Sequence, residues 1–214
     1  MRKLGLIGGL GPGATVHYYK ELINAKAGEI LIIHADMDLV LGCVQRAERL
    51  ELAEYFARLI DRLAGGGAEM AAISAITPHF CIRELEKISA LPLVNIIEVV
   101  GNEIRSRGYK RVALFGTRFV VESRMFGMLD RIDVLVPEPD QVDAIHNAYM
   151  KTVEGGTEGR DVLTRIAREL PVDAIVLAGT DLSMIFDETN TDFPHVDGAK
   201  VHIRAIVRAL AEQG

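Results

Sequence analysis

The sequence has little cysteine, and its hydrophobic runs are short. The two cysteines, Cys43 and Cys81, form neither a CxxC pair nor a metal-type spacing, so we expect buried thiols and neither a disulfide nor a metal site. No segment approaches the run of about 20 apolar residues that crosses a bilayer, so no membrane partner is expected. The apolar run at residues 4–7 is too short for a signal peptide. A cytoplasmic protein is therefore predicted.

Positive charge is also in deficit. The chain has 24 Lys and Arg residues against 30 Asp and Glu residues, a net charge of −6 and a pI of about 5.5. This balance argues against a nucleic-acid partner. Hydrophobic residues make up 49% and charged residues 25%, which is ordinary for a globular protein. A length of 214 residues allows one large domain or two small ones.

The most informative segment lies near the N-terminus, at residues 6–15. Four glycines and a proline interrupt an apolar run within six positions, and helical spacing of apolar residues follows. This pattern predicts a strand, a tight turn and a helix start, which together often form an anion site. We therefore expect Gly9, Gly11 and Pro12 to contact a small anionic ligand.

A dinucleotide site is an alternative interpretation of the same turn. Residues 9–14 approximate GxGxxG, and Asp36 or Asp38 follows at about the right distance. The third glycine comes one position early, however, and Pro12 stiffens the loop where backbone amides would face a pyrophosphate. A nucleotide-dependent oxidoreductase is therefore the least favoured hypothesis.

Strand and helix patterns alternate along the whole chain. Strands are expected at 4–8, 29–35, 69–74, 93–95, 111–115, 133–136 and 174–178, and helices at 50–64, 99–107, 123–131, 141–153, 158–169 and 200–212. Such alternation predicts an α/β fold with doubly wound parallel sheets. Because residues 69–79 and 173–182 resemble each other, we expect two pseudo-symmetric lobes with the site between them. Their predicted bounds are 1–98 plus 199–214 for the first lobe and 99–198 for the second.

Five segments together resemble a known family, the aspartate/glutamate racemases that work without pyridoxal phosphate. In the family's order they are GGLGPGATVHYY at 8–19, GAE to ITPH at 67–79, LFGT at 114–117, LAGTDL at 177–182 and the closing residues Pro194, Asp197 and His202. The resemblance covers nearly the whole chain. It implies a two-lobed α/β fold, a small carboxylate or amino-acid ligand, no cofactor, no metal and a homodimer.

The sequence departs from this family at the two positions that carry its chemistry. The family removes and returns the α-proton with two cysteines, and the resemblance places Ala75 and Gly179 at those positions. Neither residue has an ionisable group. His79 and Cys81 are the candidate substitutes, and a helix start and a nearby imidazole are expected to lower the pKa of the Cys81 thiol. Core packing is the simpler interpretation of Cys81.

The ligand-binding residues are better retained. The resemblance and the strand ends point to Thr77, Thr117, Thr180 and Asp181, although a threonine at a helix start is as often only a cap. His202 is expected to fix the last helix, as is Asp197. Replacing both Ala75 and Gly179 with cysteine is predicted to restore racemisation.

Three functions remain open beside the oxidoreductase. The favoured one is an isomerase-class enzyme, close to the amino-acid racemases, that works without the two thiols. A catalytically inactive carboxylate-binding paralogue is the second. A one-base lyase or decarboxylase on the same fold is the third.

Overall fold

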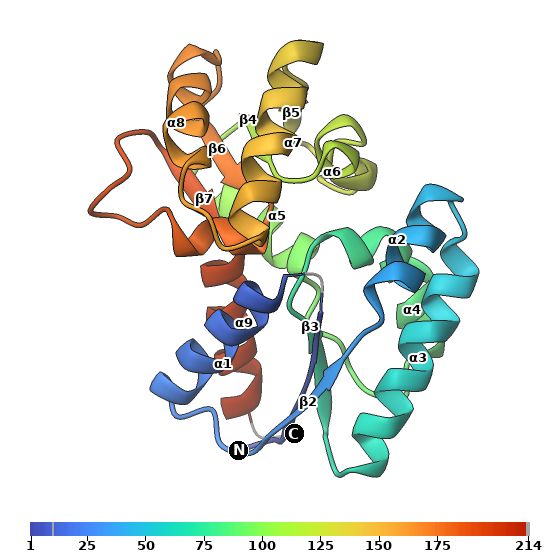
Figure 1. Ribbon diagram of the computed structural model, residues 1–214. Coiled ribbons are helices and arrows are strands. Elements are labelled where there is room, and N and C mark those ends of the chain that lie inside the picture. Colours follow the sequence, from blue (N-terminus) through green and yellow to red (C-terminus); the bar gives the residue numbers. More distant parts are fainter. Residues whose placement is uncertain (10, 213–214) are drawn as a thin grey trace. The chain divides into compact units, whose positions relative to one another are not determined.

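Two parallel β-sheets organise the chain, and each lies at the centre of one unit (Figure 1). The computed structural model describes residues 1–9 and 11–212. Unit 1 comprises Met1–Asn95 and His202–Gly214, and unit 2 comprises Ile96–Val201. The predicted α/β class with parallel sheets in two lobes is confirmed. No helix among the described residues has the length and apolar character needed to span a membrane.

Unit 1 contains a three-stranded sheet in the order β2-β1-β3. Its elements are β1 (Leu4–Gly8), α1 (Pro12–Asn24), β2 (Ile30–His34), α2 (Met37–Gln45), α3 (Arg49–Gly65), β3 (Met70–Ile73), the 3-10 helix η1 (Thr77–Cys81) and α4 (Ile82–Ile88). The central strand β1 is buried along its whole length, which explains its uninterrupted apolar sequence. Both neighbours pair with it in parallel, so the carboxyl ends of β1, β2 and β3 share one edge.

Unit 2 contains a four-stranded sheet in the order β5-β4-β6-β7. Its elements are α5 (Ile96–Ser106), β4 (Arg111–Phe115), α6 (Arg118–Glu122), the 3-10 helix η2 (Met125–Gly127), β5 (Asp133–Leu135), α7 (Pro139–Val153), α8 (Gly159–Glu169), β6 (Ala174–Leu177), the 3-10 helix η3 (Thr180–Met184) and β7 (His195–Asp197). The division between the units falls inside α9 (Gly198–Ala211). All strand pairs are again parallel.

All but one of the predicted strands and most of the predicted helices occur within a few residues of their expected bounds. The helix expected at 123–131 is wrong: α6 ends at Glu122, and Arg124, Met125 and Phe126 all have positive φ angles between 53° and 63°. Left-handed backbone cannot continue an α-helix. The strand expected at 93–95 is reduced to a single bridge between Ala71 and Leu93. No predicted helix range covers α2, α4 or α6, and no predicted strand covers β7.

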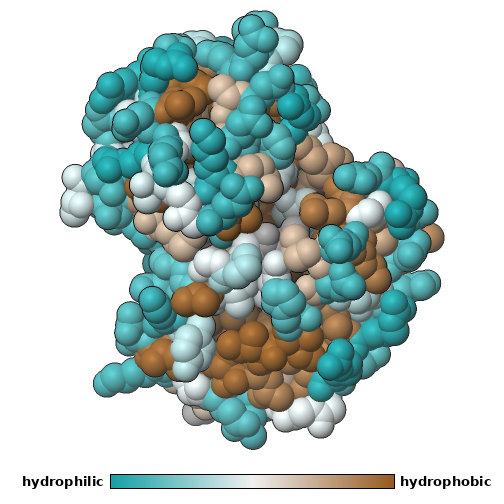
Figure 2. Space-filling model, in the orientation of Figure 1, coloured by the Kyte–Doolittle hydropathy of each residue, from teal (hydrophilic) through white to brown (hydrophobic). Residues whose placement is uncertain are grey.

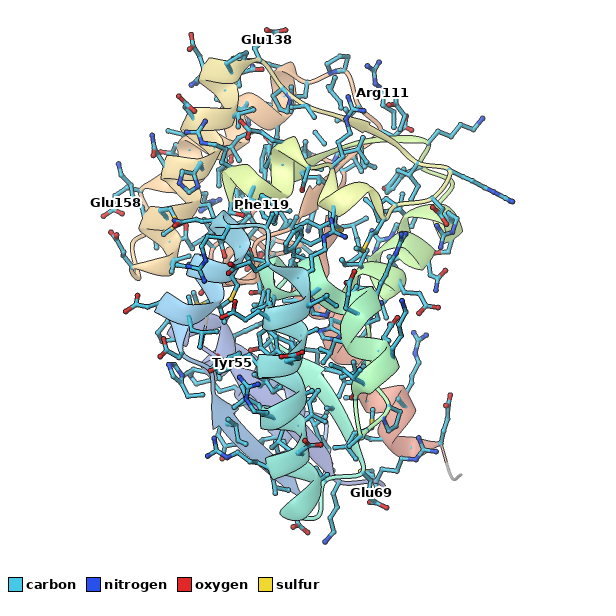
Figure 3. All side chains as sticks on the ribbon, turned by 90° about the vertical axis from the view of Figure 1, so that its right-hand side faces the viewer. Tyr55, Glu69, Arg111, Phe119, Glu138 and Glu158 are labelled. Atoms are coloured by element: carbon cyan, nitrogen blue, oxygen red, sulfur yellow. The ribbon has the colours of Figure 1, made fainter. Side chains whose placement is uncertain are left out.

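Hydrophobic side chains fill both units. In α3 the buried face consists of Leu52, Ala53, Phe56, Leu59, Ile60 and Leu63. Leu50, which helical spacing assigns to that face, is instead largely exposed. Tyr55 of the same helix, labelled in Figure 3, accepts a hydrogen bond at its hydroxyl from the backbone N–H of Asp36, at 2.6 Å. The bond ties the loop after β2 to α3.

Candidate functional site

The glycine turn connects the carboxyl end of β1 to the start of α1. Side-chain hydrogen bonds link this turn to the carboxyl end of β3. Gly9 has a φ of +139°, and a Cβ there would lie 2.8 Å from the carbonyl oxygen of Ala35, so only glycine fits. Its backbone N–H donates to Thr15 Oγ1 at 3.2 Å, and Thr15 Oγ1 lies 3.4 Å from Ser74 Oγ. Ser74 in turn donates to the carbonyl oxygen of Ile7 at 3.2 Å. A chain of hydroxyl groups therefore links the two strand ends.

The other predicted residues of the turn begin the helix. Gly11 is the residue before α1, in extended conformation, and Pro12 occupies the first helical position, where its missing N–H has no consequence. The position between Gly9 and Gly11 lies outside the described residues. The residue before α1, Gly11, makes no side-chain cap hydrogen bond.

Asp36, a candidate in the less favoured dinucleotide interpretation, has a structural role. It precedes α2, and its Oδ1 accepts hydrogen bonds from the backbone N–H groups of Asp38 (3.0 Å) and Leu39 (3.2 Å). This is N-capping, which satisfies two donors at the helix start. One oxygen of the Asp36 carboxylate therefore binds backbone N–H groups of α2.

Two buried histidines, His79 and His202, lie next to each other near the carboxyl end of β3. His79 Nδ1 donates to the carbonyl oxygen of Ala75 at 2.8 Å, and its ring faces His202 edge-on at 6.4 Å. His202 Nε2 donates to the carbonyl oxygen of Val94 (2.8 Å), and its Nδ1 accepts from the hydroxyl of Tyr18 (3.0 Å). Burial lowers the pKa of His79 to about 3, helped by His202, and lowers the pKa of His202 to about 4. Both rings are therefore neutral at pH 7, and Nε2 of His79 carries no proton.

The expected lowering of the Cys81 pKa is wrong. The thiol is fully buried and lies 3.4 Å from the carbonyl oxygen of Pro78. Burial, followed by the charge of Glu84, raises its pKa to about 12. Desolvation of the thiolate thus outweighs the helix start and the imidazole. Cys81 is a neutral core thiol at neutral pH.

Two predicted positions, Ala75 and Thr77, follow β3 closely. Ala75 and Thr77 are buried together with Ser74, and Thr77 begins η1. Ala75 offers its carbonyl oxygen to His79 and has no side-chain polar group.

The carboxyl ends of β4 and β6 carry the predicted residues of unit 2. Thr117 caps α6, since its Oγ1 accepts from the backbone N–H of Val120 at 3.3 Å. Thr180 begins η3 and is buried. Asp181 is 1% exposed and accepts a hydrogen bond at Oδ2 from the hydroxyl of Tyr149, at 3.2 Å. Burial, then the charge of Asp181, raises the pKa of Tyr149 well above its ordinary value, so the phenol stays protonated.

Gly179 leaves room for an aromatic ring. Its backbone is extended, with φ −114° and ψ 116°, a conformation that any residue adopts. A Cβ built on it would nevertheless lie 2.2 Å from Cε2 of Tyr149. The expectation that a cysteine at this position simply restores a thiol is therefore corrected, because the Tyr149 ring fills the space.

Sequence reasoning missed Tyr149 and its neighbour His146, both on α7. His146 Nδ1 accepts from the backbone N–H of Arg118 at 3.3 Å, and burial, then the charge of Arg118, lowers its pKa. The sequence pattern predicted the helix at 141–153 but singled out no residue in it. Its contact with Gly179 and Asp181 joins segments about thirty residues apart, which no local pattern signals.

Asp197 and His202 hold α9, as the sequence predicts. Asp197 Oδ1 accepts from the backbone N–H of Lys200 (3.0 Å) in the first turn and from the hydroxyl of Ser183 (2.5 Å). His202 binds the carbonyl of Val94 and the hydroxyl of Tyr18, as described above. Both side chains are buried, so their role is to fix the helix.

A possible set of metal ligands lies elsewhere in unit 1. Among the described residues, the ligand atoms of Cys43, Glu48 and Glu51 lie within 4.8 Å of one another. Burial and the charge of Glu51 raise the pKa of the Cys43 thiol, and Glu48 is paired with Arg46 at 2.6 Å. The group therefore contains an ion pair beside a buried thiol.

Comparisons with known proteins agree with these features. An aspartate racemase homologue from Pyrococcus horikoshii superposes with a TM-score of 0.83 at 22% identity, over 99% of this chain and 100% of that one. Picrophilus torridus aspartate racemase gives a TM-score of 0.79 at 20% identity, over 100% and 96% of the two chains. Glutamate racemase from Francisella tularensis, solved with D-glutamate, gives 0.64 at 14% identity, over 98% and 81%. These similarities show the fold. The family model of Asp/Glu/hydantoin racemases matches residues 7–206, and the chain therefore belongs to the Asp/Glu/hydantoin racemase family.

Proposed function

We propose that this protein is an isomerase-class enzyme that binds a small amino acid of the aspartate or glutamate type and exchanges its α-proton without cysteine. The observation that carries the proposal is the set of buried polar residues placed directly after β3 and β6, namely Ser74, Thr77, Thr180 and Asp181. Ligands of α/β proteins bind at the carboxyl ends of parallel strands. Family membership and relatives named as aspartate and glutamate racemases support the choice of substrate.

Ala75 and Gly179 occupy the two cysteine positions in this proposal, so the proton must move through other groups. In unit 1 the candidate base is His79, because its Nδ1–H is held by the Ala75 carbonyl and its Nε2 lone pair is unprotonated. Its lowered pKa makes it a weak base in the free protein. A base of this kind works only where the bound substrate acidifies its own α-proton.

A binding-only protein is the second candidate, and the same burial favours it. The pKa values of about 3 for His79 and about 12 for Cys81 leave both groups uncharged at pH 7, and neither is tuned to transfer a proton near that pH. Such a protein would bind the amino acid and leave it unchanged.

Proton NMR in D₂O separates these functions. L- and D-aspartate and L- and D-glutamate are each incubated with the protein, and the α-proton signal is followed. Loss of the signal with intact substrate is expected, and it should stop in His79→Gln, since glutamine cannot take a proton. An unchanged signal with saturable binding would identify the binding-only protein. Disappearance of the substrate itself would identify a lyase or decarboxylase.

We also propose that the protein is a homodimer joined through α1. Val16, Tyr19 and Ile23 lie on one face of this helix and are about half exposed, and Ile32 of the edge strand β2 is exposed as well. Figure 2 shows a broad hydrophobic area over the part of unit 1 where Figure 1 draws β2, beside α1. Large exposed apolar patches mark interfaces. Exposed Lys20 and Glu21 flank the stripe with opposite charges, which suits a second copy related by a twofold axis.

A further inference from the structure

A polar cavity of about 510 Å³ lies within unit 2, and its walls do not include Thr117, Thr180 or Asp181. One wall is a face of α8, and the other is the segment 189–192 that precedes β7, which Figure 1 draws beside α8. The volume falls in the usual range of small-molecule sites, about 300–1,000 Å³. The helix wall consists of Arg160, Asp161, Thr164, Arg165 and Arg168.

Positive charge exceeds negative charge in this cavity, although the chain as a whole has a net charge of −6. The lining contains three arginines and two aspartates, Asp161 and Asp192. Positions 160, 164 and 168 lie one above the other on α8, because residues four apart share a face of a helix. The excess of guanidinium groups on one helix face favours an anionic ligand.

Arg160 is the guanidinium with N–H groups to spare. The residue is half-buried, and one of its Nη atoms donates to the carbonyl oxygen of Asn190 at 2.8 Å, which holds the side chain against the segment 189–192. In the described parts of the chain, 1–9 and 11–212, no carboxylate forms an ion pair with it. A guanidinium has five N–H donors in a fixed plane, so most of them remain for the oxygens of a ligand.

The other two arginines of the cavity are held by ion pairs that a ligand can replace. Arg168 pairs with Asp192, and Arg165 pairs with Glu169 at 3.2 Å, and all four side chains are exposed. Exposed ion pairs are weak, so a ligand of higher charge can take over a guanidinium. A phosphate monoester carries about −1.5 to −2 charges at pH 7 and three strong acceptor oxygens, whereas a carboxylate carries one charge. The cavity therefore favours a phosphate over a carboxylate.

The opposite wall keeps its shape through hydrogen bonds within the loop. Asp187 Oδ1 accepts from the backbone N–H and the hydroxyl of Thr189, at 2.7 and 2.6 Å, and from the backbone N–H of Asn190, at 3.1 Å. The hydroxyl of Thr191 donates to Asn190 Oδ1 at 3.2 Å. Because both threonine hydroxyls donate within the loop, each can only accept a hydrogen bond from a ligand. This wall therefore suits the hydroxyl groups of a ligand, and the helix wall suits its phosphate.

We propose that this cavity binds a small phosphorylated polyol, such as a sugar phosphate. The phosphate contacts Arg160 and Arg168, and the hydroxyl groups of the polyol face Thr189 and Thr191. The site is independent of the proposed function, because its walls belong to α8 and the segment before β7 and not to the residues that follow β4 and β6.

Isothermal titration calorimetry at neutral pH and low salt tests the proposal. The probes are glycerol 3-phosphate, ribose 5-phosphate and glucose 6-phosphate, and each is compared with the same polyol without its phosphate. We expect at least one phosphorylated probe to bind saturably and at least about tenfold more tightly than its neutral counterpart, the usual effect of a charge-assisted hydrogen bond. Arg160→Gln should weaken this binding about tenfold or more, and Arg160→Lys should weaken it less, because lysine keeps the charge but not the planar fork.

Arg62→Gln is the matched control, since Arg62 is an exposed arginine of α3 in unit 1, and it should leave the binding unchanged. Asp192→Asn frees Arg168 from its carboxylate partner and should tighten the binding, which keeps the proposal testable if Arg160→Gln does not fold. The absence of saturable binding by every phosphorylated probe would overturn the proposal. Wild-type affinity in an Arg160→Gln variant with an unchanged circular dichroism spectrum would also overturn it, as would succinate that binds as tightly as the phosphorylated probes.

Discussion

The Cys81 thiol lies inside unit 1 against the carbonyl of Pro78, and Cys43 is buried in the same unit. Burial raises the pKa of both thiols, to about 12 for Cys81. Because the thiolate is the reactive form, a raised pKa suppresses alkylation and disulfide exchange. At the scale of single residues, burial thus decides the chemistry of these side chains more than their sequence neighbours do.

Thiol labelling checks this directly. We expect a chromogenic disulfide reagent at pH 8 to react with neither thiol of the folded protein. In denaturant, the reagent should react with both thiols at once. The count in denaturant serves as the internal control. A thiol that reacts within seconds in the folded protein would contradict the raised pKa. The variants Cys43→Ser and Cys81→Ser would identify the reacting cysteine.

Helix α1 illustrates how an element can serve two surfaces. Ala14, Tyr18 and Leu22 are buried in unit 1, whereas Val16, Tyr19 and Ile23 form the exposed apolar stripe. If this stripe joins two copies, Tyr19→Asp should convert a dimer into a monomer, because a carboxylate would be buried without a partner. Light scattering after size exclusion measures the mass.

Leu50→Asp provides the matched control, since Leu50 is an exposed leucine on another helix, α3. It should leave the mass unchanged. A wild-type protein that elutes as a monomer at high concentration would contradict the proposal for α1, and so would a Tyr19→Asp variant that remains dimeric.

Most elements could be predicted because parallel strands buried on both faces are read as plain apolar runs. The strand β7 was missed because it is three residues long and includes His195 and Asp197. The helix expected at 123–131 failed at consecutive left-handed residues, a choice that no local pattern signals. In the candidate site, the threonines and Asp181 could be located by their place after strands. The Tyr149 contact could not, since it depends on how α7 packs against η3.

At the scale of the whole molecule, the buried pair of His79 and His202 couples stability to pH. Their pKa values are about 3 and about 4 in the folded protein, against an ordinary value of 6.5. Below pH 6.5 the unfolded chain takes up protons at both rings and the folded chain does not. The free energy of unfolding should therefore fall as the pH drops from 6.5 toward 4. Each ring can contribute a slope of up to about 1.4 kcal/mol per pH unit.

Urea unfolding at pH 7, 6 and 5 measures this slope. His202→Gln keeps a donor for the Val94 carbonyl and an acceptor for Tyr18, but does not titrate, so the slope should become shallower. His34→Gln, at an exposed position in β2, is the control and should keep the wild-type slope. Parallel curves for wild type and His202→Gln would contradict the prediction.

The division of unit 1 between the two ends of the chain also sets an order for synthesis on the ribosome. Unit 2 is one continuous stretch, Ile96–Val201, whereas unit 1 needs His202 and the residues after it. The bond between Tyr18 and His202 spans 184 positions and forms only after residue 202 has been made. Residues 1–95 are therefore made before unit 2, but the unit to which they belong is completed after it, and until then Tyr18 cannot bond to His202.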